Sequence, residues 1–234
     1  DHAHAHARSV AKVVPSMPWL SFNNARTFYE DQQGQGDAVD EVPVLLIHGW
    51  GSGSHEWDLT APVLQRHGYR VIRPHLLGHG HSDKPDNGYS VSNFAKQVMT
   101  LMDHLNLEQI HLVGISMGGM VGFEMGVHHA DRLKSLTIVN SIPAVIVRGL
   151  KFRAFIAMQH MMTTFLPMSM LGRCMARAMF PKPEHESIRQ VFKQKWADND
   201  RKTYKRTGRG LIGWSVLDQM ESITCPTLVV AGRR

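Results

Sequence analysis

The sequence has few cysteines and no long uninterrupted apolar run. Its 234 residues include only Cys174 and Cys225, which are too few for a disulfide framework. No stretch of about 18 uncharged apolar residues occurs, so we expect a soluble protein without a transmembrane helix. No spacing of His and Cys matches a zinc site, and we expect no metal. Cytoplasm is the expected compartment, with export after N-terminal trimming as the alternative, because the first residue is Asp1 rather than methionine.

A basic stripe with interleaved aromatic residues is also missing, although the formal net charge is +6. The densest basic group contains one aromatic residue, Tyr204, and consists of Arg201, Lys202, Lys205, Arg206 and Arg209. This pattern favours a solvated helix face over a nucleic-acid site. We therefore expect a small-molecule partner, with no nucleic acid and no membrane.

Apolar runs of strand length alternate with helical segments along much of the chain. Strands are predicted at residues 25–30, 42–47, 69–73, 109–114, 136–139 and 227–231. Helices are predicted at 56–67, 90–106 and 117–129, with Ser92 as the cap of the second. The continuous apolar run 42–47 suits a strand that is covered on both faces. The pattern predicts an α/β fold with a mainly parallel sheet and helices on both faces.

The alternation stops between residues 140 and 224, a stretch that reads as several helices. Seven of the 14 methionines fall between Met158 and Met179. We predict an N-terminal tail over 1–24, an α/β core over 25–141 and a helical cap over 142–224. Residues 225–234 would then begin the C-terminal part of the core. The alternating run from His2 to His6 is expected to be a disordered tail rather than a set of metal ligands.

Residues 114–118 carry the motif G-x-S-x-G, with Ser116 at its centre. An apolar strand is predicted to end at Gly114 and a helix to begin after Ser116. A sharp turn between them would project the hydroxyl above the sheet, and the helix would offer free N–H groups to a developing anion. We predict that Ser116 is a catalytic nucleophile, against the alternative of a serine that only caps the helix.

The segment His48-Gly49-Trp50-Gly51 follows the predicted strand 42–47. The backbone N–H groups of Trp50 and Met117 would then converge on an acyl oxygen as an oxyanion hole. His48 is interpreted as a brace for this loop rather than a base. The Trp50 side chain is expected to be a pocket wall or part of the core.

These motifs, in this order, resemble the α/β-hydrolase superfamily over residues from about Ala25 to Arg234. The pairing of H-G-W-G with G-x-S-x-G-G is similar to small serine carboxylesterases. The loop at residues 73–82 is similar to the family's D-x-x-G-x-G-x-S loop, but His75 stands where the family usually has an aspartate. That aspartate is generally structural in the family, so the difference concerns local hydrogen bonding more than catalysis.

The resemblance implies a triad in the order Ser, acid, His. It places the acid just after the predicted strand 227–231 and the histidine after one further strand, whereas the given sequence ends at Arg234. We expect either that the polypeptide continues or that this is a fragment with poor catalysis, whose uncovered sheet favours self-association. Asn140 occupies the family's alternative acid position. The later histidines are expected to lie away from Ser116: His128, His129, His160 and His185.

The predicted function is hydrolysis of a carboxylic ester through an acyl-enzyme on Ser116. A serine at this turn argues against the dehalogenase and epoxide-hydrolase branches, whose nucleophile is a carboxylate. The alternatives are a catalytically silent binding module and a serine-type C–C hydrolase or haloperoxidase-like enzyme. No cofactor is expected, since Gly78 and Gly80 lack the third glycine of a dinucleotide site. Met161 and Met162 belong either to the core or, with Trp50, to a pocket for the acyl group.

Overall fold

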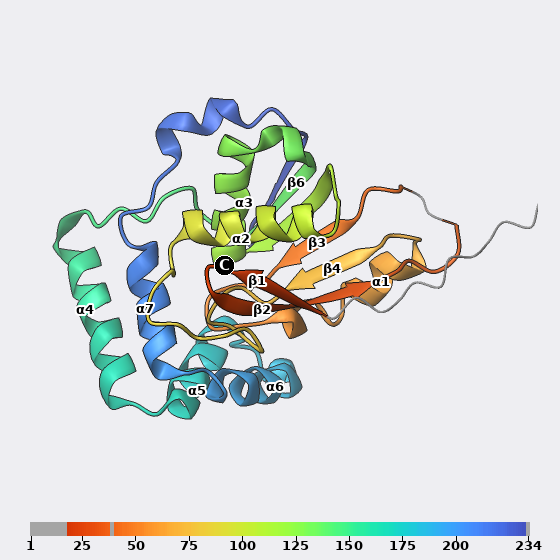
Figure 1. Cartoon of the computed structure of the whole chain (residues 1–234). Helices are drawn as coiled ribbons and strands as arrows, with labels where there is room; N and C mark the ends of the chain where they lie inside the picture. The colour runs from red at the N-terminus through yellow and green to blue at the C-terminus, as the bar shows by residue number, and fades with distance from the viewer. Residues whose placement is uncertain (1–17, 38–39, 233–234) are drawn as a thin grey trace, which may run out of the picture.

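The computed structural model describes residues 18–37 and 40–232, and the histidine run near the N-terminus lies outside this part (Figure 1). One sheet of seven strands has the order β1-β2-β4-β3-β5-β6-β7. The strands are β1 (Trp19–Phe22), β2 (Ala25–Gln32), β3 (Val44–Ile47), β4 (Val71–Pro74), β5 (Ile110–Ile115), β6 (Leu133–Val139) and β7 (Thr227–Val230). β2 runs antiparallel to β1 and β4, and the pairs from β4 to β7 are parallel. The predicted α/β fold with a mainly parallel sheet is confirmed.

Helices cover both faces of this sheet. The side chains of β3 point alternately to the two faces. On one face, Leu45 and Ile47 belong to a core cluster with residues of α2 (Val91–His104) and α3 (Met117–His128). Val44 and Leu46 pack on the other face, against Trp57 and Ala61, the latter in α1 (Ala61–Arg66). Figure 1 shows α2 and α3 on one side of the strands and α1 on the other. All four β3 side chains are buried, as the unbroken apolar run predicts.

The strand registers bring several carboxyl ends to one edge. Ile47 pairs with Gly114, Ile115 with Val139, and Val139 with Val230. Because these strands are parallel, the residues that follow β3, β5, β6 and β7 all leave the sheet at the same edge. This is the edge where open α/β sheets bind ligands. In the described part of the chain β7 is an edge strand, and its apolar side chains are exposed. Self-association through this surface stays a prediction.

Two local predictions were wrong. The segment 56–67 is not one helix: a short 3-10 turn, η1 (Ser54–Trp57), precedes α1, which begins at Ala61. Pro62 lies in the first turn of α1, where its missing N–H costs nothing, so it fixes the start of the helix. Ser90, rather than Ser92, caps α2, because its hydroxyl accepts a hydrogen bond from the Asn93 N–H at 3.2 Å.

The strand β1 was missed by the sequence prediction. Asn23 and Asn24, which link it to β2, have φ angles of 50° and 60°. Two consecutive residues with positive φ form the tight turn that matches the twist of a hairpin, and asparagine tolerates that conformation. The Asn-Asn pair was therefore the available signal for this hairpin.

Between β6 and β7 the described chain forms helices, as predicted. They are α4 (Gly149–Phe165), α5 (Met168–Met179), α6 (Glu186–Ala197) and α7 (Arg201–Leu211). We call α4–α7 the helical insertion. Its own cluster contains Met168, Leu171, Trp196 and Tyr204, with Trp50 of the core packed against it. Short 3-10 turns complete the described elements: η2 (Ala130–Arg132), η3 (Pro183–His185) and η4 (Leu217–Ser222). No helix among the described residues combines the length and apolarity that crossing a bilayer requires.

Candidate active site

Ser116 lies in a strained turn between β5 and α3. Its φ and ψ angles are 51° and −115°, a conformation that residues other than glycine rarely adopt. Its N–H donates to the Val139 carbonyl at 3.0 Å, and its carbonyl accepts from the Met120 N–H at 3.1 Å. The residue is exposed, although Met117 beside it is fully buried. The turn is thus anchored by its backbone while the side chain faces the open edge of the sheet.

The glycines of the motif let three backbone segments approach closely. A Cβ on Gly114 would lie 2.2 Å from the Gly118 carbonyl oxygen, and one on Gly118 would lie 2.3 Å from the Ile47 carbonyl oxygen. Real Cβ atoms do not come so close to backbone. Glycine at both positions is therefore a steric requirement of the turn, as the sequence motif implies.

The loop after β3 passes directly beside Ser116. A Cβ on Gly49 would lie 3.4 Å from the Ser116 Cβ. The buried His48 donates from Nδ1 to the Gly49 carbonyl at 2.8 Å and accepts at Nε2 from the Leu76 N–H at 3.1 Å. Burial is the main cause that holds the pKa of His48 well below its usual range, so the ring is neutral. These contacts make His48 a brace for the loop.

Glu56 is a second brace that sequence reasoning missed. Its carboxylate accepts from the Gly49 N–H at 2.7 Å, and burial raises the pKa of this carboxyl. Ser141 was also missed; its hydroxyl donates to the Ser116 carbonyl at 2.6 Å. Neither residue belongs to a motif, because both act through a contact with backbone that only the fold creates.

Two backbone N–H groups beside Ser116 have no hydrogen-bond acceptor among the described residues: those of Trp50 and Met117. Met117 is the first residue of α3, where N–H groups have no partner within the helix. The helix dipole adds a partial positive charge at the same end. Met117 follows Ser116 in the chain, and Trp50 follows Gly49, whose added Cβ would lie 3.4 Å from the Ser116 Cβ. An oxyanion hole formed by these two N–H groups stays a prediction.

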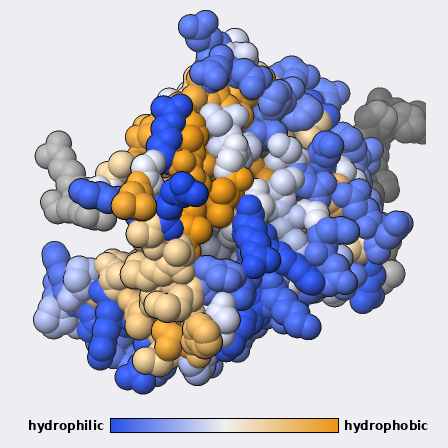
Figure 2. All heavy atoms as spheres, turned by 90° about the vertical axis from the view of Figure 1, so that its left-hand side faces the viewer, coloured by the Kyte–Doolittle hydropathy of each residue, from blue (hydrophilic) through white to orange (hydrophobic). Residues whose placement is uncertain are grey.

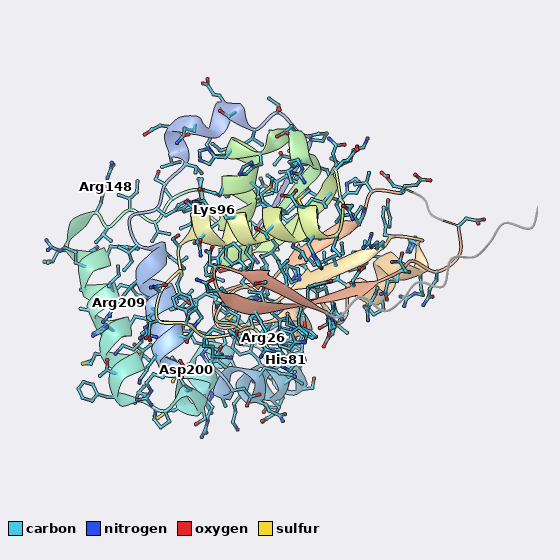
Figure 3. All side chains as sticks on the ribbon, in the orientation of Figure 1. Arg26, His81, Lys96, Arg148, Asp200 and Arg209 are labelled. Carbon is cyan, nitrogen blue, oxygen red and sulfur yellow. The ribbon has the colours of Figure 1, made fainter. Side chains whose placement is uncertain are left out.

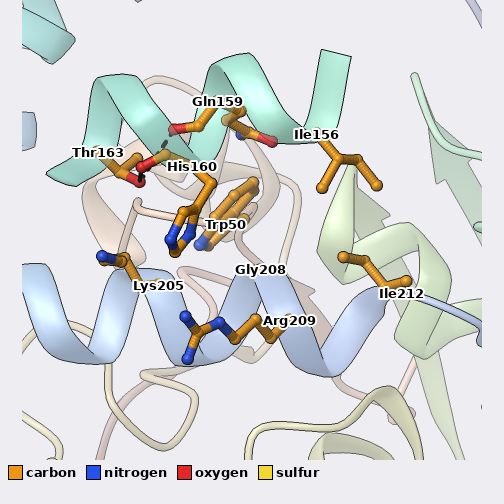
Figure 4. Close-up of a pocket in the computed structure, with 9 residues that line it drawn as sticks. All are labelled: Trp50, Ile156, Gln159, His160, Thr163, Lys205, Gly208, Arg209 and Ile212. Atoms are coloured by element: carbon orange, nitrogen blue, oxygen red, sulfur yellow. Dashed lines mark hydrogen bonds between the residues drawn. The ribbon is translucent and has the colours of Figure 1, made fainter. Parts of the chain in front are cut away.

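The Trp50 side chain points away into the helical insertion. Its ring stacks on Tyr204 at 4.3 Å between centroids, and its Nε1–H donates to the Tyr204 carbonyl at 3.0 Å. The ring borders a small cavity of about 50 Å³ between α4 and α7 (Figure 4). Its lining consists of Trp50, Ile156, Gln159, His160, Thr163, Lys205, Gly208, Arg209 and Ile212. Trp50 therefore belongs both to the loop beside Ser116 and to the lining of a cavity that contains two cationic residues, Lys205 and Arg209.

The two methionines singled out in the sequence lie in different surroundings. Met161 is 55% exposed on the outer side of α4. Met162 is partly buried and packs against the cluster of the helical insertion. Neither lines the cavity beside Trp50.

No described histidine or carboxylate is hydrogen-bonded to the Ser116 hydroxyl. His160 borders the cavity beside Trp50, and His128 lies near Glu124, with 3.9 Å between its Nε2 and a carboxylate oxygen. Asn140 ties two strand ends together, since its Oδ1 accepts from the Gly232 N–H at 2.9 Å. The backbone that follows β7 is therefore held at the same edge as Ser116. The described residues also contain no group of three His, Cys, Asp or Glu side chains placed to hold a metal ion.

His75 is part of a buried hydrogen-bond network in place of the family's aspartate. Its Nδ1 accepts from the His81 N–H at 2.9 Å, and its Nε2 contacts the Ser54 hydroxyl at 2.9 Å. Ser54 in turn donates to Glu30, which also pairs with Arg73. Both ring nitrogens therefore have partners, and the histidine satisfies the loop without the usual carboxylate. Glu30 and Ser54 could not be found from a motif.

The network predicts acid sensitivity of the fold. The contact with His75, whose Nε2 lies 3.6 Å from a Glu30 carboxylate oxygen, is the main cause that lowers the pKa of Glu30 from 4.5 to about 2, with Ser54 and Arg73 adding to it against burial. A lowered pKa stabilises the fold above about pH 4.5, and this contribution disappears as the pH falls toward 2. Glu30→Gln is therefore expected to lower the free energy of unfolding by about 1–3 kcal/mol at neutral pH.

Urea unfolding at a series of pH values measures this effect. The difference between Glu30→Gln and the parent protein should shrink as the pH falls through the acid range. Asp86→Asn is the control, because Asp86 forms an exposed pair with Arg206 and should change stability little. A Glu30 effect that stayed constant down to pH 2 would contradict the linkage.

Comparison with known proteins identifies the family of the chain. Residues 42–171 match the family model described as alpha/beta hydrolase fold. The chain is 32% identical over 200 residues to 3-oxoadipate enol-lactonase 1 of Acinetobacter baylyi, covering 85% of this chain and 73% of that protein. It is 34% identical over 110 residues to a soluble epoxide hydrolase of Corynebacterium sp., covering 47% of this chain and 38% of that protein. Several curated relatives are thus matched over only about two fifths of their length.

A solved structure shows the same fold. The enol-lactonase from Burkholderia xenovorans LB400 superposes with a TM-score of 0.78 over 93% of this chain and 82% of that one. Its sequence identity is 20%, so this likeness concerns the fold alone.

Proposed function

Since the chain belongs to the alpha/beta hydrolase fold family, we propose that it hydrolyses carboxylic esters with Ser116 as the nucleophile. The observation that carries the proposal is the exposed serine on its strained turn, with the unpaired N–H groups of Trp50 and Met117 beside it. A nucleophile and two donors for an oxyanion are the parts that acyl transfer needs.

The proposed reaction has two halves. The Ser116 oxygen attacks the acyl carbon, and the carbonyl oxygen becomes an anion held by the N–H groups of Trp50 and Met117. Collapse of this intermediate breaks the bond to the alcohol, which leaves with the proton taken from the serine. Water then attacks the acyl-serine, releasing the acid and restoring the hydroxyl.

The proton of Ser116 must pass to a base at the carboxyl edge of the sheet. The resemblance assigns this role to a histidine whose acid partner follows the strand β7. The hydrogen bond from the Gly232 N–H to the Asn140 side chain holds the backbone after β7 at that edge. We propose that the imidazole acts from this side, since the other faces of Ser116 are occupied by the loop at Gly49 and by α3.

The chemistry of the nucleophile favours an ester over an epoxide. An acyl-serine is readily hydrolysed when two N–H donors stabilise its oxyanion. The carboxylate used by the epoxide-hydrolase branch is absent from position 116. An enol-lactone is a cyclic ester, so the relationship to a 3-oxoadipate enol-lactonase supports the same bond type.

Labelling with a fluorophosphonate probe tests the proposal directly. The probe reacts with an activated serine and should modify Ser116 in a one-to-one ratio, as peptide mass spectrometry can verify. The competing function is a silent binding module, which is favoured by the absence of a described hydrogen bond to the Ser116 hydroxyl. Lack of labelling, together with stabilisation of the fold by acyl ligands, would support that second function instead.

The cavity beside Trp50 supports a finer proposal, that the ester carries an anionic group. Lys205 and Arg209 line it, and no acidic residue is in its lining. The double variant Lys205→Gln with Arg209→Gln is expected to raise KM for a carboxylate-bearing ester roughly fivefold, because an attraction between unit charges is lost. Its kcat should stay unchanged, since this attraction is the same in ground and transition states.

Two controls make this result specific. A neutral ester of similar size should show no change in KM for the double variant. Lys202→Gln, on the same helix but outside the cavity, should leave both esters unaffected. An equal rise in KM for both esters would indicate a general disturbance of the pocket and would contradict recognition of charge.

A further inference from the structure

The outer side of α4 is apolar where a surface helix is usually polar. Leu150 is 82% exposed, Met158 47%, Met161 55% and Phe165 78%. At 3.6 residues per turn, these four residues fall within an arc of about 80° around the helix axis. Ala154 and Ala157 lie on the same side and are exposed too. The opposite side, with Ile156, Gln159 and Thr163, faces α7 across the cavity (Figure 4).

Basic residues border this apolar side. Lys151 and Arg153 are exposed at positions that flank it around the helix, and Arg148 precedes the first turn. In Figure 3, Arg148 projects outward at the start of α4. Figure 2 views this side of the molecule and shows an apolar area among hydrophilic side chains. Long basic side chains beside apolar ones can reach phosphate groups while the apolar residues enter the acyl region.

The charge of the whole segment has the same sign. Residues 142–224 contain 14 Lys and Arg against six Asp and Glu, a net charge of +8, so the rest of the chain carries −2. From residue 141 to residue 183 there is no acidic residue at all. The positive charge is therefore concentrated on the part of the protein that exposes the apolar helix.

Although the sequence alone led us to expect no membrane partner, we propose that α4 binds the surface of an anionic lipid bilayer, lying in the plane of the interface. Leu150, Met158, Met161 and Phe165 would enter the bilayer, and Arg148, Lys151 and Arg153 would contact lipid phosphates. A second copy of the chain is a poorer occupant, because a symmetric contact through this side would bring like charges together. The described residues contain no helix that could cross a bilayer, which is compatible with this mode because the helix lies on the membrane surface. The proposal does not rest on the chemistry of Ser116.

Co-sedimentation with vesicles tests the proposal. The protein should bind vesicles of phosphatidylcholine mixed with phosphatidylglycerol, and high salt should weaken binding because the charges are screened. Binding to pure phosphatidylcholine should be weaker by about tenfold or more. Leu150→Gln with Phe165→Gln, and separately Lys151→Gln with Arg153→Gln, should each reduce binding to the mixed vesicles by about tenfold or more.

Matched controls lie elsewhere on the surface. Leu59→Gln changes a residue that is 88% exposed on the core, and Lys96→Gln with Lys134→Gln removes two exposed charges there. These variants should bind as the parent does, and thermal unfolding should show that every variant is folded. Absence of binding, equal binding to neutral vesicles, or insensitivity to both α4 pairs would each overturn the proposal. A dimer in size-exclusion chromatography that Leu150→Gln with Phe165→Gln dissociates would assign this side to a second copy and overturn it as well.

Discussion

Replacing Ser116 by alanine is expected to lower kcat/KM for ester hydrolysis by about 10³-fold or more. The substitution removes the only atom that can form the acyl-enzyme at the strained turn. It keeps the backbone contacts of that turn, because the bonds to Val139 and Met120 use the main chain. KM should change little, since substrate binding does not depend on the attacking oxygen.

A chromogenic aryl ester, assayed under initial-rate conditions, measures this loss. Ser141→Ala is the matched control: its hydroxyl supports the Ser116 carbonyl, which also accepts from the Met120 N–H. Loss of one of two hydrogen bonds should cost about tenfold or less. If Ser116→Ala retained the parent rate, another residue would be the nucleophile and the proposed function would be rejected.

Replacing Gly118 by alanine is expected to produce the largest loss of stability among single methyl additions in α3. The new Cβ would lie 2.3 Å from the Ile47 carbonyl oxygen and 2.8 Å from the His48 carbonyl oxygen. Both contacts are to backbone, so no side-chain rotation can relieve them. We expect the free energy of unfolding to fall by about 3 kcal/mol or more, the upper end for overpacking.

Gly126→Ala on the same helix separates sterics from helix propensity. Its Cβ would meet the ends of Leu136 and Ile223 at 3.1–3.3 Å, and these side chains can move. The gain in helix propensity, about 1 kcal/mol, should offset that packing cost. Urea unfolding of the two variants should therefore differ clearly. Equal stabilities would show that the approach of α3 to the end of β3 is looser than the structure indicates.

The same Gly118 substitution should also disturb the active site. Ile47 ends β3 and His48 begins the loop that carries Trp50, so a shift of this backbone would move one of the two proposed oxyanion donors relative to Ser116. Fluorophosphonate labelling of the folded fraction is expected to slow. Gly126→Ala, which lies two turns farther along the helix, should label at the parent rate.

The strand–turn–helix unit around Ser116 could be predicted from the sequence because its determinants are local. Apolar runs of strand length mark β3, β5 and β7, and the glycines at 114 and 118 mark the tight approach at the turn. The helical insertion was also visible, since the strand pattern stops after β6. Each of these features depends on neighbours within a few residues, which a single sequence displays.

The contacts that complete the site depended on distant segments. The Glu56 carboxylate accepts a hydrogen bond from the Gly49 N–H, and the Ser141 hydroxyl donates one to the Ser116 carbonyl. The Asn140 side chain accepts one from the Gly232 N–H. No sequence motif indicates any of these three hydrogen bonds. The hydrogen-bond network around His75 includes Glu30 from β2 and Ser54 from η1, the 3-10 turn that follows β3. These hydrogen-bond partners come together only because elements far apart in the chain pack against each other, so the sequence alone could not identify them.

The sequence by itself thus determined the alternation of strands and helices and the strand–turn–helix unit that carries Ser116, because backbone conformation and apolar periodicity are local properties. Only the tertiary structure decided which way the side chains of the helical insertion face. Met161 and Met162 are adjacent in the chain, yet one is exposed and the other packs inward. That choice follows from which side of α4 packs on the rest of the helical insertion, and two adjacent methionines do not specify it.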